Sequence, residues 1–144
     1  MLRLRRNVGL CIAIIGMSAL GWVAFRRVRN LMMLGYVDSA IGRVRAIVAA
    51  EAEFAKTNPQ VGYTCTLSQL PSDQTLVRLR RDGQDNGYAF AILGCGLKQP
   101  HSKYHITARP LHSGPPAFCS DESGILRLDE DGSVEKCIAY GVPL

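Results

Sequence analysis

The chain has 144 residues, a net charge of +5 and 47% hydrophobic residues, a size and composition that fit one small folded domain plus one apolar segment. Six of its seventeen basic residues are arginines that flank a single apolar run, so the remainder of the chain is nearly neutral. The basic charge therefore gives little support to a nucleic-acid-binding domain.

The first predicted element is a membrane-spanning helix. Eighteen consecutive uncharged residues, Val8 to Phe25, contain no proline and have three arginines on either side. A helix of this length spans roughly 27 Å, close to the thickness of the hydrocarbon core of a bilayer. We expect residues 1–30 to form a basic N-terminus and membrane anchor, which argues against a freely diffusing enzyme. The candidate residues for anchoring and helix packing are Leu10, Ile12, Ile14, Ile15, Leu20 and Val23.

A cleaved signal peptide is the alternative interpretation of this run. Ala19, Leu20 and Gly21 form a passable cleavage site. The run is long for a signal peptide, however, and Arg26 and Arg27 follow it directly, which disfavours export past that point. Because arginines flank both ends, their distribution hardly decides the orientation of the anchor.

Residues 31–57 are predicted to continue the same helix as an amphipathic segment. Apolar residues recur at spacings of three and four, as expected for one helix face, at Leu34, Val37, Ile41, Val44, Val48, Ala52 and Ala55. We expect the opposite face to carry Asp38, Arg43, Arg45, Glu51 and Lys56. Thr57, Asn58 and Pro59 end the helix, since the residue before a proline is disfavoured in the helical conformation.

The rest of the chain predicts a loop and a small antiparallel sheet. Residues 58–86 are expected to connect helix and sheet, with a short helical turn at Leu67 to Leu70. Period-two alternation then predicts strands within residues 87–140, around Tyr88 to Ile92, Tyr104 to Ala108, Ile125 to Leu128 and Val134 to Ile138, with Asp131 and Gly132 as the last turn. Residues 31–144 should thus form one α+β domain.

Four cysteines follow the predicted anchor: Cys65, Cys95, Cys119 and Cys137. Their even number, and the absence of any zinc or haem spacing, favours two disulfides over free thiols. Disulfides require an oxidising compartment, so we expect the N-terminus in the cytoplasm and the C-terminal domain on the outer side of the membrane.

Several segments of the chain resemble type IV pilin-like proteins and pseudopilins of the kind found in acidobacteria. The resemblance covers residues 36–137, and its segments are Ser39 to Phe54, Gly62 to Leu67 with Leu70, Gly87 to Phe90, Tyr104 to Pro110, Phe118 to Arg127, and Asp131 with Gly132. It implies a pilin-like fold, in which a long N-terminal helix packs on the sheet. It also implies disulfides between Cys65 and Cys95 and between Cys119 and Cys137.

The N-terminus departs from the pilin pattern. The resemblance places leader cleavage between Gly9 and Leu10, but the fifth residue after that bond is Ile14, where family members carry a glutamate. This departure favours a minor or uncleaved member over an abundant filament subunit. We expect a structural subunit of a type IV pilus or type II secretion-type filament, in the inner membrane or in an extracellular filament, with other pilin-like subunits or an assembly platform as partners in a homo- or hetero-oligomer. The alternative is a membrane-tethered periplasmic binding module that does not polymerise.

The remaining polar motifs have plain structural interpretations. Asp129 to Ser133 resembles a calcium loop, but a simple turn is favoured because the glutamate spacing of an EF-hand is missing. A DNA-binding patch of Arg43, Arg45, Arg78, Arg80 and Arg81 lacks interleaved aromatic residues, so nucleic acid is only a weak candidate partner. His101, His105 and His112 are interpreted as scattered surface residues. No catalytic motif is present, so no enzyme activity and no cofactor are predicted.

Overall fold

The computed structural model describes the backbone of residues 2–71 and 73–144 and the side chains of residues 21–28, 34–71 and 73–144. The chain divides into two compact units, Met1–Gly35 and Tyr36–Leu144. Helix α1, Leu2–Thr57, contributes to both. It ends at the predicted residue, immediately before Asn58 and Pro59.

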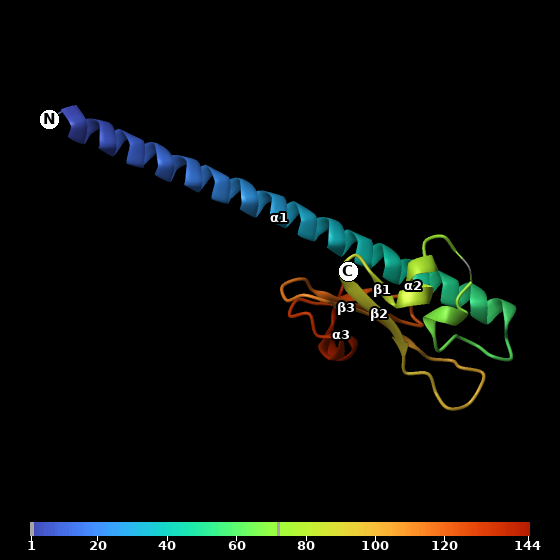
Figure 1. The fold of residues 1–144 in the computed structure, drawn as a ribbon. Coiled ribbons are helices and arrows are strands. Elements are labelled where there is room, and N and C mark those ends of the chain that lie inside the picture. Colours follow the sequence, from blue (N-terminus) through green and yellow to red (C-terminus); the bar gives the residue numbers. More distant parts are fainter. Residues whose placement is uncertain (1, 72) are drawn as a thin grey trace. The chain divides into compact units, whose positions relative to one another are not determined.

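The second unit is an α+β domain in which a sheet follows the end of α1 (Figure 1). After α1, its elements are η1 (Leu67–Gln69), α2 (Val77–Asp82), β1 (Gln84–Asp85), β2 (Tyr88–Leu93), β3 (His105–Pro110), β4 (Ala117–Asp121), β5 (Arg127–Asp129), α3 (Val134–Tyr140) and β6 (Val142–Pro143). Over the described part of the chain, the six strands pair antiparallel in chain order from β1 to β6.

The strand register decides which side chains face the helix α1. Phe90 pairs with Ala108, Ala108 with Phe118, and Phe118 with Leu128, so these four residues share one face of the sheet. All four belong to the core cluster or pack against it, together with Ala40, Val44 and Ile47 of α1. The C-terminal part of α1 therefore covers this face.

Helix α3 covers the other face of the sheet (Figure 1). Thr107 and Cys119 are paired across β3 and β4 and point to that side, and both are buried. With helices on both faces, all residues from Ala117 to Ser120 are buried. Strand β4 consequently lacks the period-two alternation by which β2 and β3 are predicted from sequence.

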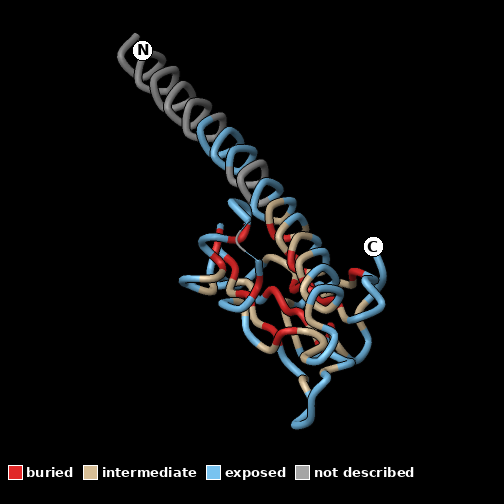
Figure 2. The backbone as a smooth tube through the Cα atoms, turned by 90° about the vertical axis from the view of Figure 1, so that its right-hand side faces the viewer, coloured by how far each residue is buried: buried red, intermediate tan, exposed pale blue. Residues whose placement is uncertain are grey.

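The buried stripe of α1 differs from the predicted one. Figure 2 shows the buried positions of α1 within the second unit, and they are Ala40, Val44, Ile47 and Glu51. Glu51, predicted on the polar face, is therefore in the core. Leu34 and Ala52, predicted on the apolar face, are exposed. These positions are spaced four, three and four residues apart, as the helical period requires. The prediction missed this stripe because Glu51, an acidic residue, is part of it.

The last predicted strand is wrong, because residues 134–140 form α3. Ser133 caps this helix, since its hydroxyl accepts a hydrogen bond from the Lys136 backbone N–H at 3.2 Å. Glu135 lies in the first turn, where a negative charge is favourable. Asp131 and Gly132 thus precede a helix and do not join two strands. The predicted connecting loop, 58–86, also contains α2 and β1, although its helical turn at Leu67–Gln69 is present.

The predicted membrane-spanning first half of the long helix is contradicted. Among the residues whose side chains are described, no helix combines the length and the apolar character needed to cross a membrane.

Most of the predicted anchor falls outside the described side chains. Only residues 21–25 of the apolar run have described side chains, and among them Val23 is exposed. The other proposed anchor residues and the proposed cleavage site lie outside the residues whose side chains are described: Gly9, Leu10, Ile12, Ile14, Ile15 and Leu20.

Candidate interaction surface and its surroundings

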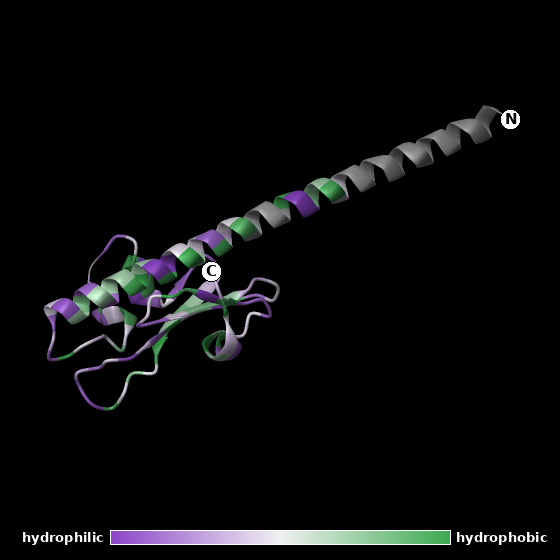
Figure 3. Cartoon of the chain, turned by 180° about the vertical axis from the view of Figure 1, so that it is seen from behind, coloured by the Kyte–Doolittle hydropathy of each residue, from purple (hydrophilic) through white to green (hydrophobic). Residues whose placement is uncertain are grey.

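The first unit presents large apolar side chains to solvent. Trp22, Val23, Phe25 and Val28 are each at least half exposed, at 57%, 54%, 64% and 50%, and Figure 3 shows apolar positions along this stretch of α1. Trp22, Phe25 and Val28 are three residues apart, so they lie on one side of the helix. We call these three residues the apolar stripe. Exposed aromatic side chains grouped in this way are typical of interaction surfaces.

Arginines border the apolar stripe. The Arg26 guanidinium lies 3.8 Å from the centroid of the Trp22 ring, close enough for a cation–π contact. Arg27 is exposed beside it. A partner surface for this region would therefore need apolar side chains for the stripe and acidic or carbonyl oxygens for the arginines.

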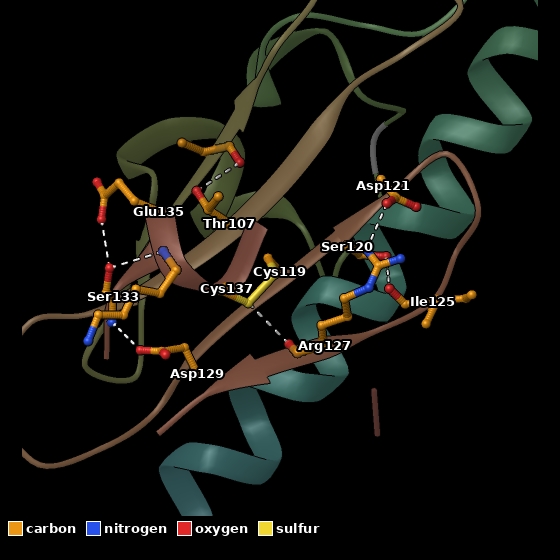
Figure 4. Close-up of a disulfide and its surroundings, with 12 residues drawn as sticks. Thr107, Cys119, Ser120, Asp121, Ile125, Arg127, Asp129, Ser133, Glu135 and Cys137 are labelled. Carbon is orange, nitrogen blue, oxygen red and sulfur yellow. Dashed lines mark hydrogen bonds and ion pairs between the residues drawn. A yellow bond between two sulfur atoms is a disulfide. The ribbon is translucent and has the colours of Figure 1, made fainter. Parts of the chain in front are cut away.

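Both predicted disulfides are present among the described residues, with the pairing that the pilin resemblance implies. Cys119 and Cys137 join β4 to α3, with Cα atoms 5.9 Å apart, and both residues are buried (Figure 4). Cys65 and Cys95 have Cα atoms 5.8 Å apart and join the segment after α1 to the segment after β2. The two bridges join segments that are 30 and 18 residues apart in the sequence.

An ion pair stabilises the turn between β4 and β5 near the second disulfide (Figure 4). The Arg127 guanidinium donates to Asp121 Oδ2 at 2.8 Å, and Ser123 donates to Asp121 Oδ1 from both its N–H and its hydroxyl. Burial alone would raise the pKa of Asp121, but these hydrogen bonds and the Arg127 charge outweigh it and lower the pKa to about 2. The turn is therefore held by an ionised carboxylate.

The structure does not gather the five arginines of the predicted nucleic-acid patch. Arg43 Nε donates to the buried Asp85 at 2.7 Å, and Arg78 lies 3.7 Å from the same carboxylate. Arg81 pairs with Asp82 at 2.7 Å. Arg45 lines a different hollow, beside Val44 and Leu126, and Arg80 donates to the Ser68 carbonyl. Most of these arginines therefore interact with carboxylate or carbonyl groups of the same domain.

The three histidines lie at separate places in the second unit. His101 pairs through its backbone with Gly62, His105 begins β3, and His112 lines a cavity of about 370 Å³ with Tyr36 and Asn86. Within the described residues, no group of three His, Cys, Asp or Glu side chains is placed to hold a metal ion.

Each aspartate of the calcium-like loop contacts a neighbouring group. Asp129 Oδ1 accepts from the Ser133 N–H at 2.9 Å, and Asp131 pairs with Lys136 at 2.7 Å. These contacts connect the end of β5 to the start of α3. The two carboxylates therefore stabilise the turn between β5 and α3.

Glu51 is the polar residue that the sequence interpretation missed. Its side chain is buried, and both carboxylate oxygens accept hydrogen bonds from Thr64. The available signal was its spacing of four residues from Ile47 and seven from Val44, which puts it on the buried stripe. Glu53, two residues further along, is exposed, so the two glutamates lie on different faces of α1.

Comparison with protein-family models and with curated proteins finds no match to this chain. The resemblance to pilin-like proteins therefore stays a prediction.

Proposed function

We propose that this protein is a structural subunit that assembles with other pilin-like subunits through the N-terminal part of α1, in a filament of the type IV pilus or type II secretion kind. The observation that carries the proposal is the exposed apolar stripe of Trp22, Phe25 and Val28. The resemblance of residues 36–137 to pilin-like proteins supports it independently.

The energetics favour burial of the stripe by a partner helix. Removing a large apolar side chain from water contributes about 1.5–3 kcal/mol, so three partly exposed residues can supply several kcal/mol to an interface. Residues three apart on a helix form a ridge that fits the groove of another helix. Since the chain supplies the same stripe in every copy, association of identical or related subunits is the simplest way to bury it.

The proposal is tested by sedimentation of the purified full-length chain over a range of concentrations. We expect the unaltered chain to form oligomers, and the double substitution Trp22→Ser with Phe25→Ser to weaken association at least tenfold, because interface aromatics commonly contribute about 2 kcal/mol or more each. Circular dichroism of both proteins checks that the helix content is retained.

A matched control is available in the second unit. Leu97 is fully exposed in the segment between β2 and β3, so Leu97→Ser removes exposed apolar surface without touching α1. This variant should associate as the unaltered chain does. A monomeric unaltered chain, or equal loss of association in both variants, would contradict helix-mediated assembly.

The second candidate function is a binding module that does not polymerise. Ile14 favours it, because the glutamate expected there in filament-forming relatives is missing from the sequence. The cavity lined by Tyr36, Asn86 and His112 offers aromatic and polar groups for a ligand. The sedimentation experiment separates the two candidates, since this one requires a monomer at all concentrations.

A further inference from the structure

Glu51 is a buried acid on the core side of α1. Its residue is 0% exposed, and its neighbours on the same stripe, Val44 and Ile47, are equally buried. Burying a carboxylate without a cation is costly, and proteins usually avoid the cost by pairing or by protonation. Among the described residues, the ion pairs to acids involve Asp82, Asp85, Asp121 and Asp131, and none involves Glu51.

Thr64 is the residue that binds the Glu51 carboxylate. The Thr64 N–H donates to Oε2 at 2.7 Å, and the Thr64 hydroxyl donates to Oε1 at 2.5 Å. Thr64 is itself buried, and it precedes Cys65, which is bonded to Cys95. Glu51 therefore holds the segment after α1 against the helix at the point where the disulfide connects that segment to the sheet.

The titratable side chain that interacts electrostatically with Glu51 is Tyr104. Tyr104, immediately before β3, is buried, and burial together with the charge of Glu51 raises its pKa. Tyr63, from the same segment as Thr64, contacts Tyr104 edge to face at 4.6 Å between ring centroids. Asp121 and Glu122, from the turn between β4 and β5, add further negative charge around Tyr104. For Glu51 itself, burial is the cause that disfavours the ionised form.

We propose that Glu51 and Thr64 form a proton-linked latch, in which proton uptake by Glu51 on acidification strengthens the attachment of residues 58–66 to α1. This inference does not depend on the proposed assembly, because every group in it lies in the second unit.

The hydrogen bonds of the latch can be completed in the protonated state. A proton on Oε1 turns that atom from acceptor into donor toward the Thr64 oxygen. The Thr64 hydroxyl then donates to the Thr66 carbonyl, which lies 3.2 Å away. Oε2 still accepts from the Thr64 N–H. Protonation thus removes the buried charge and leaves each donor with an acceptor.

The direction of the pH dependence follows from the pKa of Glu51. Burial raises this pKa above the ordinary value of 4.5 and outweighs the two hydrogen bonds from Thr64, which lower it. A folded state with the higher pKa binds the proton more tightly than the unfolded chain does. The stabilisation is therefore complete below the ordinary value and is lost as the pH rises through the raised value.

The test is urea unfolding of the oxidised full chain between pH 7 and pH 4, for the unaltered protein and for Glu51→Gln. The glutamine amide reproduces the protonated latch, because its oxygen can accept from the Thr64 N–H and its nitrogen can donate to the Thr64 hydroxyl. We expect the folding equilibrium constant of the unaltered chain, relative to Glu51→Gln, to rise severalfold on acidification. Taking this ratio cancels the titration of groups that both proteins share.

Glu53→Gln is the matched control, since it removes an exposed acid from the same helix; it should keep the pH dependence of the unaltered chain. The proposal is overturned if Glu51→Gln keeps that dependence as well. If Glu51→Gln does not fold, hydrogen exchange of the Thr64 amide in the unaltered chain decides: protection, corrected for the intrinsic rate, should increase from pH 7 to pH 4. Constant or falling protection would refute the latch.

Discussion

Val23 and Val44 lie on the same helix, yet one is 54% exposed and the other is fully buried. In the second unit, the sheet covers the apolar side of α1. In the first unit, the described apolar side chains have no other element of that unit against which to pack. The comparison shows that an apolar residue in this helix can serve either the fold or an interface, and helical periodicity alone does not distinguish the two.

The largest expected effect concerns the second unit and its internal cross-links. Replacing Cys119 and Cys137 together by alanine should lower the free energy of unfolding by about 3 kcal/mol, because the bridge closes a loop with a sequence separation of 18 residues. Urea unfolding of the oxidised proteins measures this difference. Equal stability of the variant and the unaltered chain would mean that packing alone holds α3 on the sheet.

The comparison of the two valines can be tested directly with one substitution at both positions. Val44→Ala should destabilise the chain by about 2 kcal/mol, since it removes buried methyl groups and leaves a cavity in the core. Val23→Ala should change the stability of the monomer by less than about 0.5 kcal/mol. Thermal unfolding at low protein concentration measures both, and similar losses would show that residue 23 is already packed.

The smallest effect is expected from the ion pair between Asp121 and Arg127 near the turn between β4 and β5. The pKa of Asp121 is about 2 in the folded chain and 3.8 ordinarily. Its stabilising contribution is therefore present above pH 3.8 and is lost as the pH falls toward 2. Asp121→Asn should abolish this loss, which we expect to be under about 1 kcal/mol because the pair is partly solvated.

Glu130→Gln is the control for this measurement, because it removes an exposed negative charge from the end of the same hairpin. Acid unfolding followed by circular dichroism should show the change for Asp121→Asn alone. An identical acid response of both variants would assign the effect to net charge, and the Asp121–Arg127 ion pair would then have no specific role.

Local sequence signals were sufficient where the interactions that decide the structure are themselves local. The end of α1 at Thr57 follows from Pro59, the helical turn at Leu67–Gln69 was found, and alternation located β2 and β3. Alternation signals failed for residues 134–140, although the capping residue Ser133 was a local signal for a helix there. They also failed for β4, which is buried on both faces.

The sequence by itself determined the α+β class, the long helix, the number of cysteines available for bridges and the apolar character of residues 8–25. The tertiary structure decided that Glu51 is buried, that α3 covers one face of the sheet, and that Arg43 and Asp85 pair across 42 positions of the chain. The physical reason is that burial and ion pairing depend on residues distant in sequence, whereas helix ends and strand alternation depend on near neighbours.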